Sequence, residues 1–558
     1  MMKQIFTLFI LVCLVYFAEA QNVGIGTITP AGKLHVKGGA DTSQLMIDAN
    51  TIQTNLHPLI KLRTADGTDL MHIHSDNTAN IFMGVNAGVL NNAAAGGLNN
   101  TFIGNHSGAA NISGQGNTTH GAEALSHNTT GGFNTISGFQ AAQLNTAGDS
   151  NVAMGSFSLN RNVFGKANTA IGMSSMYFNT GSYNTAVGFE SLNQNSTGTY
   201  NAATGTQALR QNTTGAGNAA TGYRALYANT TGNDNTATGY EALYANTTGG
   251  ANVAAGISAL YSNTTGISNV AVGKDALYYN TSGGLNVALG IGALYNNTGG
   301  YFNVACGSSA MSNSTTGSEN TVVGDQSFLK NTVGDYNVVI GREAGDNFGD
   351  DIFYNNQRCV FIGHQAHPFD PAAGSLSGYD NAIAIGDYAE VDGSNKVRIG
   401  NGFMTSIGGF VNWTNISDGR FKKNIQKNVK GLDFILKLEP VTYNLDMGAL
   451  NAFTRNTVTA AEPAFRSLQA NSAKKEAVVQ TGFIAQAVEK AALETGYNFS
   501  GVDKPESAGG MYGLRYAEFV VPLVKAIQEQ QQMIGDMQKQ IQALQQQNKS
   551  LLQMIKPK

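Results

Sequence analysis

The sequence predicts a mainly β protein, in which a repetitive β-solenoid or β-roll fibre precedes a small α+β domain and a C-terminal coiled coil. Glycine accounts for 68 of the 558 residues and charged residues for only 13%, against about a quarter in ordinary globular proteins. The motif Asn-x-x-x-Gly recurs from Asn100 to Asn337 in steps of 17 residues, with a single step of 16. An apolar heptad pattern runs from Val520 to Ile555.

Composition and charge exclude several kinds of function. A net charge of -4 gives no electrostatic reason to bind nucleic acid. Among the repeats, no acid pair and no His/Cys/Asp/Glu cluster has the spacing of a catalytic or metal site. We therefore expect neither a cofactor nor a bound metal.

Residues 1–20 have the pattern of a signal peptide. Lys3 precedes an apolar run that ends at Ala18-Glu19-Ala20, the small-x-small sequence that signal peptidase reads. We expect export, a mature chain that begins near Gln21, and a secreted or cell-surface location. An N-terminal membrane anchor is the alternative interpretation. No later segment has about 18 uninterrupted apolar residues, so the mature chain is not expected to span a membrane.

The repeat at residues 218–234 illustrates why the array is predicted to form coils of sheet. Its glycines, Gly222 and Gly232, each follow a threonine, and glycine forms turns because it tolerates positive φ. Two turns in 17 residues leave runs too short for an ordinary helix. Each repeat is therefore predicted to form one coil with short strands.

The predicted apolar core of each coil is thin. The third residue of the repeat is almost always alanine, as at Ala220, and the eighth and ninth are Ala225 and Leu226. At roughly 25 cal/mol per Å² of buried apolar surface, such side chains contribute little hydrophobic free energy. We therefore expect copies of the chain to pack together as an obligate oligomer.

Two further features recur with the repeat. One is a predicted tyrosine ladder, which indicates either stacking that stiffens the coils or a stripe that binds a glycan or another surface. Its members are Tyr227, Tyr244, Tyr261, Tyr278 and Tyr295. The other is the sequence Asn-x-Thr/Ser, as at Asn229-Thr230-Thr231, which matches a glycosylation acceptor but is interpreted as turn chemistry.

Composition divides the chain into six segments. The repeat rhythm persists at Asn381-Ala-Ile-Ala-Ile-Gly386, and charged residues become frequent from residue 418 onward. The predicted segments are a signal peptide at 1–20, an N-terminal β region at 21–99, the repeat array at 100–345, a β transition at 346–417, a small domain at 418–519 and a coiled coil at 520–558.

A candidate self-cleavage site lies at the start of the small domain, in Ser417-Asp-Gly-Arg-Phe-Lys-Lys-Asn-Ile425. All histidines and cysteines precede residue 417, which leaves Ser417 as a candidate nucleophile and Lys422 as its base. The lysine must be neutral to accept a proton, which burial or a cationic neighbour such as Arg420 would favour.

The spacing of this pair leaves alternatives open. Residues five apart do not meet on a strand or on one helix face, but a turn at Asp418-Gly419 would bend the chain back, or the lysine would come from another subunit. The purely structural interpretation makes Ser417 or Asp418 the N-cap of a helix that runs to Ile425, with the lysines in solvent.

The C-terminal region resembles the self-cleaving intramolecular chaperone domain of phage endosialidase tail spikes and related tail fibres. The resemblance rests on Ser-Asp-x-Arg-x-Lys from Ser417, then Leu438-Glu-Pro-Val-Thr-Tyr443, Gly482-Phe-Ile-Ala-Gln486 and Tyr516-Ala-Glu-Phe519. It implies that residues 418–519 are an auto-processing chaperone domain, which drives the assembly of a homotrimer and is released by the cut. By the same resemblance, Ser417 is the nucleophile, Lys422 the base, and scission falls between Ser417 and Asp418. Attack on the preceding carbonyl would instead separate Ile416 from Ser417.

Two weaker resemblances concern the rest of the chain. Asn22-Val-Gly-Ile-Gly-Thr-Ile-Thr-Pro30 and Lys33-Leu-His-Val-Lys-Gly38 look like the start of many secreted Bacteroidetes-type surface proteins. The repeats are similar to the heads of trimeric autotransporter adhesins, although their period is longer. Both resemblances imply an extracellular fibre.

The C-terminal heptads predict a coiled coil. The seam positions are Val520, Leu523, Ile527, Gln530, Ile534, Met537, Ile541, Leu544, Asn548, Leu551 and Ile555. Isoleucine at a with leucine at d nominally favours two strands, whereas the resemblance implies three. We expect three, because several seam positions depart from the dimer rule.

Three functions follow from these observations. The first is a secreted or cell-surface trimeric fibre, adhesin-like, with a cell-surface glycan or protein as receptor. Its only enzymatic activity would be a single self-cleavage by a serine endopeptidase dyad, with no external substrate. The second is a structural fibre whose C-terminal domain trimerises but never cuts. The third, a carbohydrate-acting enzyme, lacks an acid pair or metal cluster among the repeats.

Overall fold

The computed structural model describes residues 23–25, 34–36, 47, 56–346, 355–369, 378–404, 406–410, 413–453, 472–505 and 510–555. The predicted signal peptide lies outside these ranges. The chain forms two compact units, residues 1–181 and residues 182–558. The boundary between them falls within the single 16-residue step of the repeat, which runs from Asn168 to Asn184.

In the first unit, short strands stack into parallel coils. Strands β1 and β2 form a separate parallel pair, β3 pairs antiparallel with β4, β4 pairs antiparallel with β5, and from β5 onward each strand pairs in parallel with the next. The strands are β1 (Val23–Ile25), β2 (Leu34–Val36), β3 (Ile60–Arg63), β4 (Asp69–His74), β5 (Ile81–Met83), β6 (Thr101–Ile103), β7 (Thr118–His120), β8 (Thr135–Ser137), β9 (Val152–Met154) and β10 (Thr169–Ile171), with the short helix η1 (Ala93–Ala95) between β5 and β6.

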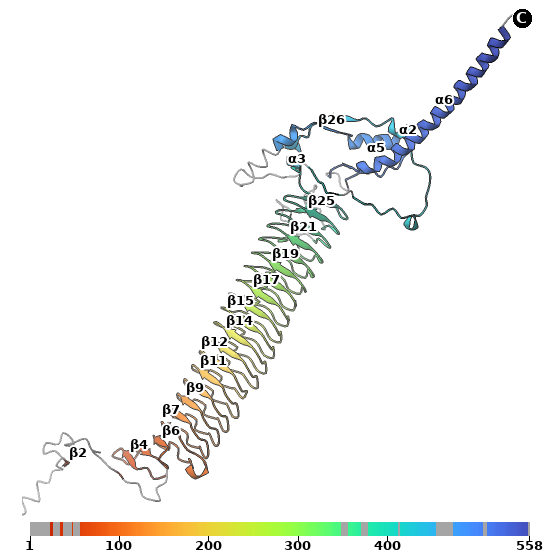
Figure 1. Ribbon diagram of the computed structural model, residues 1–558. Coiled ribbons are helices and arrows are strands. Elements are labelled where there is room, and N and C mark those ends of the chain that lie inside the picture. The colour runs from red at the N-terminus through yellow and green to blue at the C-terminus, as the bar shows by residue number, and fades with distance from the viewer. Residues whose placement is uncertain are drawn as a thin grey trace, which may run out of the picture. The chain divides into compact units, whose positions relative to one another are not determined.

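The second unit continues the pattern with one three-residue strand per coil (Figure 1). Its coil strands are β11 (Thr185–Val187), β12 (Ala202–Thr204), β13 (Ala219–Thr221), β14 (Thr236–Thr238), β15 (Val253–Ala255), β16 (Val270–Val272), β17 (Val287–Leu289), β18 (Val304–Cys306), β19 (Thr321–Val323), β20 (Val338–Ile340), β21 (Val360–Ile362), β23 (Ile383–Ile385) and β25 (Val397–Ile399). Strands β22 (His367–Pro368) and β24 (Glu390–Val391) form a second parallel pair. The predicted β-solenoid of 17-residue repeats is confirmed.

Alternation along each strand places one side chain inside the coil. On β13 the middle residue, Ala220, is 1% exposed, while its neighbours face outward. Ala225 and Leu226 of the same coil are fully buried. The apolar part of the interior is therefore the alanine and leucine set that the repeat predicts.

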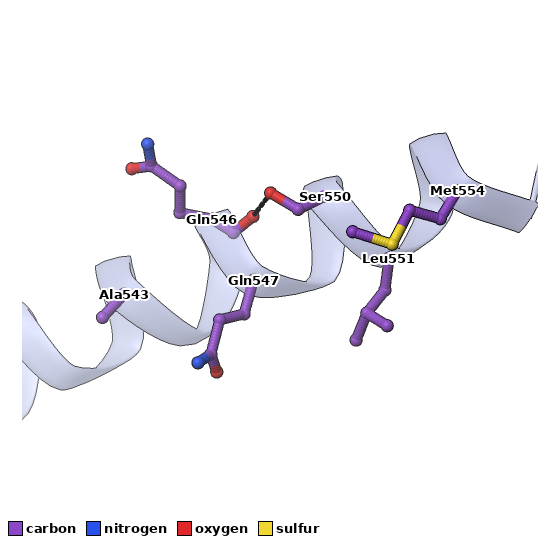
Figure 2. A pocket seen from close by; sticks show the side chains of 6 residues that line it. All are labelled: Ala543, Gln546, Gln547, Ser550, Leu551 and Met554. Carbon is purple, nitrogen blue, oxygen red and sulfur yellow. Dashed lines mark hydrogen bonds between the residues drawn. The ribbon is translucent and has the colours of Figure 1, made fainter.

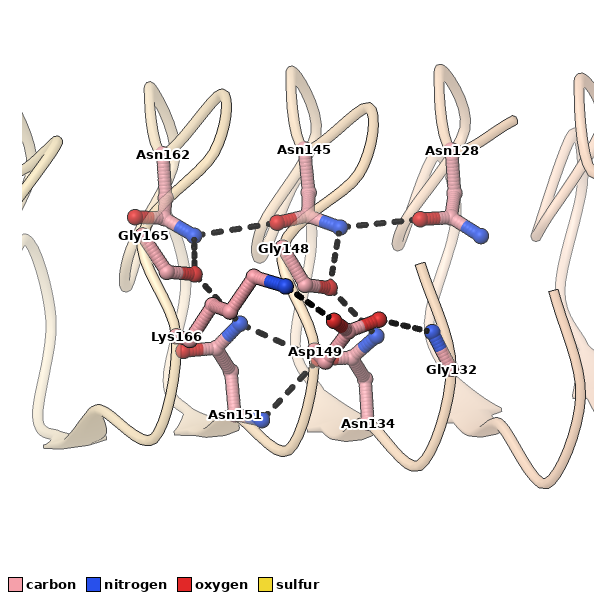
Figure 3. A network of polar contacts seen from close by, with 10 residues as sticks. All are labelled: Asn128, Gly132, Asn134, Asn145, Gly148, Asp149, Asn151, Asn162, Gly165 and Lys166. Carbon is pink, nitrogen blue, oxygen red and sulfur yellow. Dashed lines mark hydrogen bonds and ion pairs between the residues drawn. The ribbon is translucent and has the colours of Figure 1, made fainter. Parts of the chain in front are cut away.

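The interior also contains ladders of buried asparagines (Figure 3). The Asn145 side-chain amide donates to Asn128 Oδ1 at 2.8 Å and to the Gly148 carbonyl at 3.0 Å. In a second ladder, the backbone N–H and the side-chain amide of Asn151 both donate to Asn134 Oδ1, at 2.9 and 3.1 Å. The amides thus satisfy buried backbone groups and join each coil to the next.

The first of these ladders explains the predicted glycosylation sequences. In the second unit, Asn229 is fully buried, donates to Asn212 Oδ1 at 2.7 Å and accepts from the Asn246 amide at 2.8 Å. Its side chain faces the coil interior rather than solvent. The interpretation as turn chemistry is therefore correct for this sequence, and the amide joins neighbouring coils as well.

The two glycines of the repeat have different roles. Gly222 has a φ of +137°, as predicted for a turn. Gly232 does not take positive φ, and it is glycine because a Cβ would collide with the Gly249 carbonyl and the Asn229 side chain. The left-handed conformation falls instead on Leu226, at a φ of +53°, where the N–H donates to the Ala242 carbonyl of the next coil at 2.9 Å.

The predicted tyrosine ladder is present along the second unit. Neighbouring rings stack with centroids 5.0 to 5.3 Å apart. The rings involved are those of Tyr227, Tyr244, Tyr261, Tyr278 and Tyr295. Because each inner ring has a stacked neighbour on both sides, the observed contacts are those of a ladder that stiffens the coils.

The small C-terminal domain has α+β structure around an aromatic core. Phe434 is fully buried and packs with Phe499 and Phe519. Strands β26 and β27 pair antiparallel, as do β28 and β29. The elements are η2 (Gly419–Phe421), α2 (Leu432–Ile435), β26 (Val441–Tyr443), α3 (Met447–Phe453), β27 (Gln480–Gly482), α5 (Ala485–Glu494), β28 (Val502–Asp503), β29 (Gly513–Leu514), η3 (Tyr516–Phe519) and α6 (Val520–Ile555).

The last coils of the solenoid contain buried titratable side chains. His367 Nε2 on β22 lies 3.8 Å from Glu390 Oε1 on β24, and both side chains are less than a tenth exposed. Burial raises the pKa of Glu390 to about 8 and lowers the pKa of His367. The Asp346 carboxyl is also buried, which raises its pKa to about 7. These groups are therefore most stable in their neutral forms.

The asparagine ladder predicts a large effect for one amide. Asn229→Ala should lower the free energy of unfolding by about 3 kcal/mol, because partners in both neighbouring coils and the Gly232 carbonyl each lose a hydrogen bond. Urea unfolding followed by circular dichroism measures it. Thr204→Ala, on the exposed side of β12, is the matched control and should change the midpoint little. Equal midpoints for the two variants would contradict the role of the ladder.

The buried carboxyl on β24 predicts a pH dependence. Because its folded pKa of about 8 exceeds the ordinary value near 4.5, the contribution of the Glu390 carboxyl to the stability of the last coils should be full below about pH 4.5 and should be lost as pH rises toward 8. Hydrogen exchange of β24 at pH 5 and pH 8.5, corrected for intrinsic rates, measures the change. Glu390→Gln should reduce the dependence, leaving the parts due to Asp346 and His367, whereas the exposed control Glu319→Gln should leave it intact. A pH dependence in Glu390→Gln equal to that of the wild type would contradict the assignment.

Candidate functional site

Ser417 and Lys422 lie side by side because a single turn reverses the chain between them. Asp418 is the N-cap of η2, and its carboxylate accepts from the Arg420 N–H at 2.9 Å. The turn then closes with the Lys422 N–H donating to the Gly419 carbonyl at 3.1 Å. The Lys422 ammonium donates to the Ser417 hydroxyl with 2.7 Å between Nζ and Oγ.

This geometry decides between the structural alternatives for the segment. The turn at Asp418-Gly419 brings Lys422 to Ser417 within one chain. Asp418 does act as an N-cap, but the helix that it caps is the short η2, which ends at Phe421 rather than at Ile425. Arg420 pairs with Asp418, with Nε and Nη2 at 2.9 and 2.6 Å from Oδ2.

The Asp418–Arg420 pair sets the charge beside the candidate nucleophile. The guanidinium lowers the pKa of the Asp418 carboxyl, and the carboxylate raises the pKa of Arg420. The charged guanidinium of Arg420 is therefore paired with the Asp418 carboxylate. Its support for a neutral Lys422, which the sequence analysis considered, is correspondingly small.

The segment around the pair exposes an unusual number of large apolar side chains. Ser417 and Lys422 are themselves exposed. The neighbouring apolar residues and their exposed fractions are Ile407 (61%), Phe410 (110%), Trp413 (86%), Ile416 (91%), Phe421 (77%) and Ile425 (75%). We call these six residues the apolar collar. In the single chain, the pair has its contact but lacks the burial that would favour a neutral lysine.

The other three sequence motifs meet in the folded domain. Tyr443 ends β26, which pairs with β27 just before Phe483. The Phe483 N–H donates to the Tyr516 hydroxyl at 3.1 Å, and the Phe483 ring stacks on Phe519 with centroids 5.4 Å apart. Motifs that are dispersed in sequence therefore form one structural unit.

The first turns of helix α6 pack against the small domain, whereas the apolar residues farther along the helix are exposed. Near its start, Pro522 and Ala526 are buried, and Glu529 Oε2 accepts from the Leu432 N–H at 2.8 Å, which caps α2. Farther along, the apolar seam is exposed; Ile541 and Leu551, for example, are 53% and 54% exposed.

A hollow along this part of the helix is lined by α6 alone (Figure 2). Its lining residues are Ala543, Gln546, Gln547, Ser550, Leu551 and Met554. A single helix cannot enclose a small ligand. The exposed seam is instead typical of a helix that packs against other helices.

Sequence analysis missed Lys475 and Glu529. Lys475 Nζ donates to the carbonyls of Gly402 and Met404, at 2.5 and 2.8 Å. Both partners are backbone groups about 70 positions away, so no side-chain pattern in the sequence indicates the contact. Glu529 could have been singled out only as a charged residue next to the seam.

The described residues form neither a cluster of metal ligands nor a helix that could span a membrane. Within the ranges given above, no group of three or more His, Cys, Asp or Glu side chains could hold a metal ion. In the same ranges, no helix is both long and apolar enough to cross a membrane.

Comparison with known families finds a match for one part of the chain. Residues 417–497 match the family model Peptidase_S74, described as chaperone of endosialidase. The predicted resemblance is confirmed, and the C-terminal region carries a chaperone-of-endosialidase domain that follows a β-solenoid fibre body. The comparison with curated proteins found no match.

Proposed function

We propose that this chain, with its chaperone-of-endosialidase domain, is an extracellular trimeric fibre that assembles through its C-terminal domain and then cuts itself at Ser417. The agreement between the family match and the local geometry is the main support for this proposal. The family match begins at Ser417, and the hydroxyl of that residue lies 2.7 Å from Lys422 Nζ. The exposed seam of α6 and the repetitive solenoid support the assembly part.

The proposed cleavage needs only these two side chains and water. Neutral Lys422 takes the proton from the Ser417 hydroxyl, whose oxygen bonds to the Ile416 carbonyl carbon through a five-membered ring. The bond between that carbon and the Ser417 nitrogen breaks, and the nitrogen takes up the proton. Water then hydrolyses the resulting ester, which leaves an Ile416 carboxylate and a new N-terminus at Ser417. No external substrate is consumed.

The other scission, between Ser417 and Asp418, has a different requirement. Attack of the Ser417 hydroxyl on its own carbonyl would close a strained four-membered ring. That bond would therefore be cut by the hydroxyl of another copy or by a water that Lys422 activates. Mass spectrometry of the new N-terminus distinguishes the two routes, since it begins with Ser417 in one and Asp418 in the other.

Assembly would supply the burial that the single chain lacks. The residues of the apolar collar flank the pair in sequence and are exposed, and covering this segment with other copies of the chain would also remove water from the Lys422 amine. Burial favours the neutral form of an amine. Cleavage would then follow assembly rather than precede it.

Three strands suit the C-terminal helix better than two. Beyond the a and d positions, apolar residues also occupy flanking positions, and their side chains are exposed, as at Val524 (48%), Met533 (51%) and Leu552 (65%). In a three-stranded coil each helix faces two neighbours, so a wider apolar face is buried.

Export and receptor binding complete the proposal. The predicted signal peptide at residues 1–20 supports a secreted or cell-surface location. A surface glycan or protein receptor would meet exposed aromatic rings such as Tyr223 and Tyr240, which stack 5.2 Å apart and are 38% and 50% exposed. A fibre that trimerises permanently without cutting is the alternative.

Self-cleavage predicts a clear result for two variants. The purified wild type should give two bands on a denaturing gel, whereas Ser417→Ala and Lys422→Ala should each give one full-length band, because nucleophile or base is missing. Lys423→Ala is the matched control, since it removes the adjacent lysine and should still cut. An uncut wild type would favour the permanent trimer, and a cut Ser417→Ala variant would exclude the dyad.

Assembly through α6 predicts the effect of one seam charge. Ile541→Asp should convert a species of three times the chain mass into a monomer in sedimentation equilibrium, because the carboxylate would be buried without a partner. Gln546→Asp introduces the same charge at an outward heptad position and should leave the mass unchanged. A trimer in the Ile541→Asp variant would show that α6 does not hold the copies together.

A further inference from the structure

The last coil of the solenoid is covered by the chaperone domain. Met447, at the start of α3, is fully buried, and Leu450 packs closely against Gly402. At the other end of α3, the Phe453 ring lies 5.9 Å from the ring of Phe369, which is only 4% exposed. Helix α3 thus forms a lid on the solenoid end.

Polar contacts reinforce this lid. Lys475 donates to the carbonyls of Gly402 and Met404, and burial lowers its pKa, which is consistent with a partly enclosed ammonium. Arg398 Nη2, on the last coil strand β25, lies 3.6 Å from Asp503 Oδ2 on β28. Apolar packing, two hydrogen bonds and an ion pair therefore join the two sides.

All these contacts link residues before Ser417 to residues after it. The fibre side contributes Phe369, Arg398, Gly402 and Met404, and the chaperone side contributes Met447, Leu450, Phe453, Lys475 and Asp503. Ser417 itself lies in the exposed segment that bears the apolar collar. Scission there breaks one covalent link and leaves every one of these contacts in place.

A solenoid end needs such a cover. An uncovered last coil presents unpaired strand edges and an open core, which is why repeat arrays end in capping elements. Departure of the chaperone domain would expose Phe369 on one side and Met447 on the other, at about 25 cal/mol per Å² of apolar surface. The contacts therefore favour retention of the domain over its loss.

We propose that the C-terminal fragment stays bound after cleavage, as a noncovalent cap on the last coil of its own fibre. Cleavage and separation are then two distinct steps, and the partner of the lid surface is the cut end of the same chain. In a trimer, three lids hold three ends at once, which strengthens the complex by roughly 10² to 10⁴ over a single contact. This inference rests on the self-cleavage at Ser417 that is part of the function proposed above.

Size-exclusion chromatography of the processed protein tests this inference. Both fragments should elute in one peak, and the denaturing gel of that peak should give two bands. In the double variant Phe453→Ala, Lys475→Met, the share of C-terminal fragment in the fibre peak should fall about tenfold, the effect of a loss of about 1.4 kcal/mol. Lys474→Met, at the exposed neighbouring lysine, should retain both fragments. Separate elution of the wild-type fragments would overturn the proposal.

A second protein separates this inference from self-cleavage. In a Ser417→Ala chain, the recognition sequence of a site-specific protease is inserted between Gly408 and Gly409, where a Cβ on Gly408 meets nothing within 4 Å. After digestion, co-elution supports the cap even if the wild type never cuts itself. Separation of the digested fragments overturns the cap whether or not the wild type cuts.

Discussion

The buried asparagine ladders are the constraint on which the rest of the fibre depends. Asn134 Oδ1 accepts from both the backbone and the side chain of Asn151, and this pairing repeats from coil to coil. A buried amide without partners costs about 1–3 kcal/mol, so an insertion or deletion within a coil would leave groups unpaired in its neighbours. The ladders therefore fix the 17-residue period more strictly than the alanine and leucine core does, since apolar packing tolerates volume-conserving changes. The one 16-residue step, from Asn168 to Asn184, falls where the chain divides into its two compact units.

The ladders also change what a chaperone has to contribute. The sequence analysis counted only the apolar side chains of the coil and concluded that its core was thin. Each coil is in fact joined to the next by amides as well, and its strand pairs with residues only 17 positions away, as Ala220 does with Ala237. Such local pairing has a small loop-closure cost and lets coils form one after another. The contacts that cannot form locally are those between copies, and the exposed seam of α6 and the apolar collar are the surfaces left for them.

Sequence alone predicted the period, the short strands of each coil, the tyrosine ladder and the family of the C-terminal domain, because each leaves a pattern of residue types. It missed features that depend on space and backbone geometry. Leu226 takes a left-handed conformation that its residue type does not indicate, and the cost is offset where its N–H pairs with the next coil. Gly232 is needed for clearance rather than for its φ. Lys475 binds backbone carbonyls, which carry no sequence signal. At the candidate site, the residues were predicted from the sequence, while the turn that joins them was only one of several alternatives that the spacing left open.

At the candidate site, the contact between Ser417 and Lys422 is present in the single chain, whereas the burial of that contact is not. The contact between Ser417 and Lys422 needs only one turn of chain, so it forms in every copy at little cost in conformational entropy. A reaction that needed nothing more would start as soon as the turn forms, before the fibre is built. In the proposed trimer, neighbouring copies would meet a second condition, because covering the exposed collar would also remove water from the Lys422 amine. The proposed cut would lie apart from the contacts that cover the last coil, so hydrolysis would remove the covalent link between fibre and chaperone domain and leave those contacts unchanged. Under this proposal, burial would set the timing of cleavage, and packing would retain the C-terminal fragment.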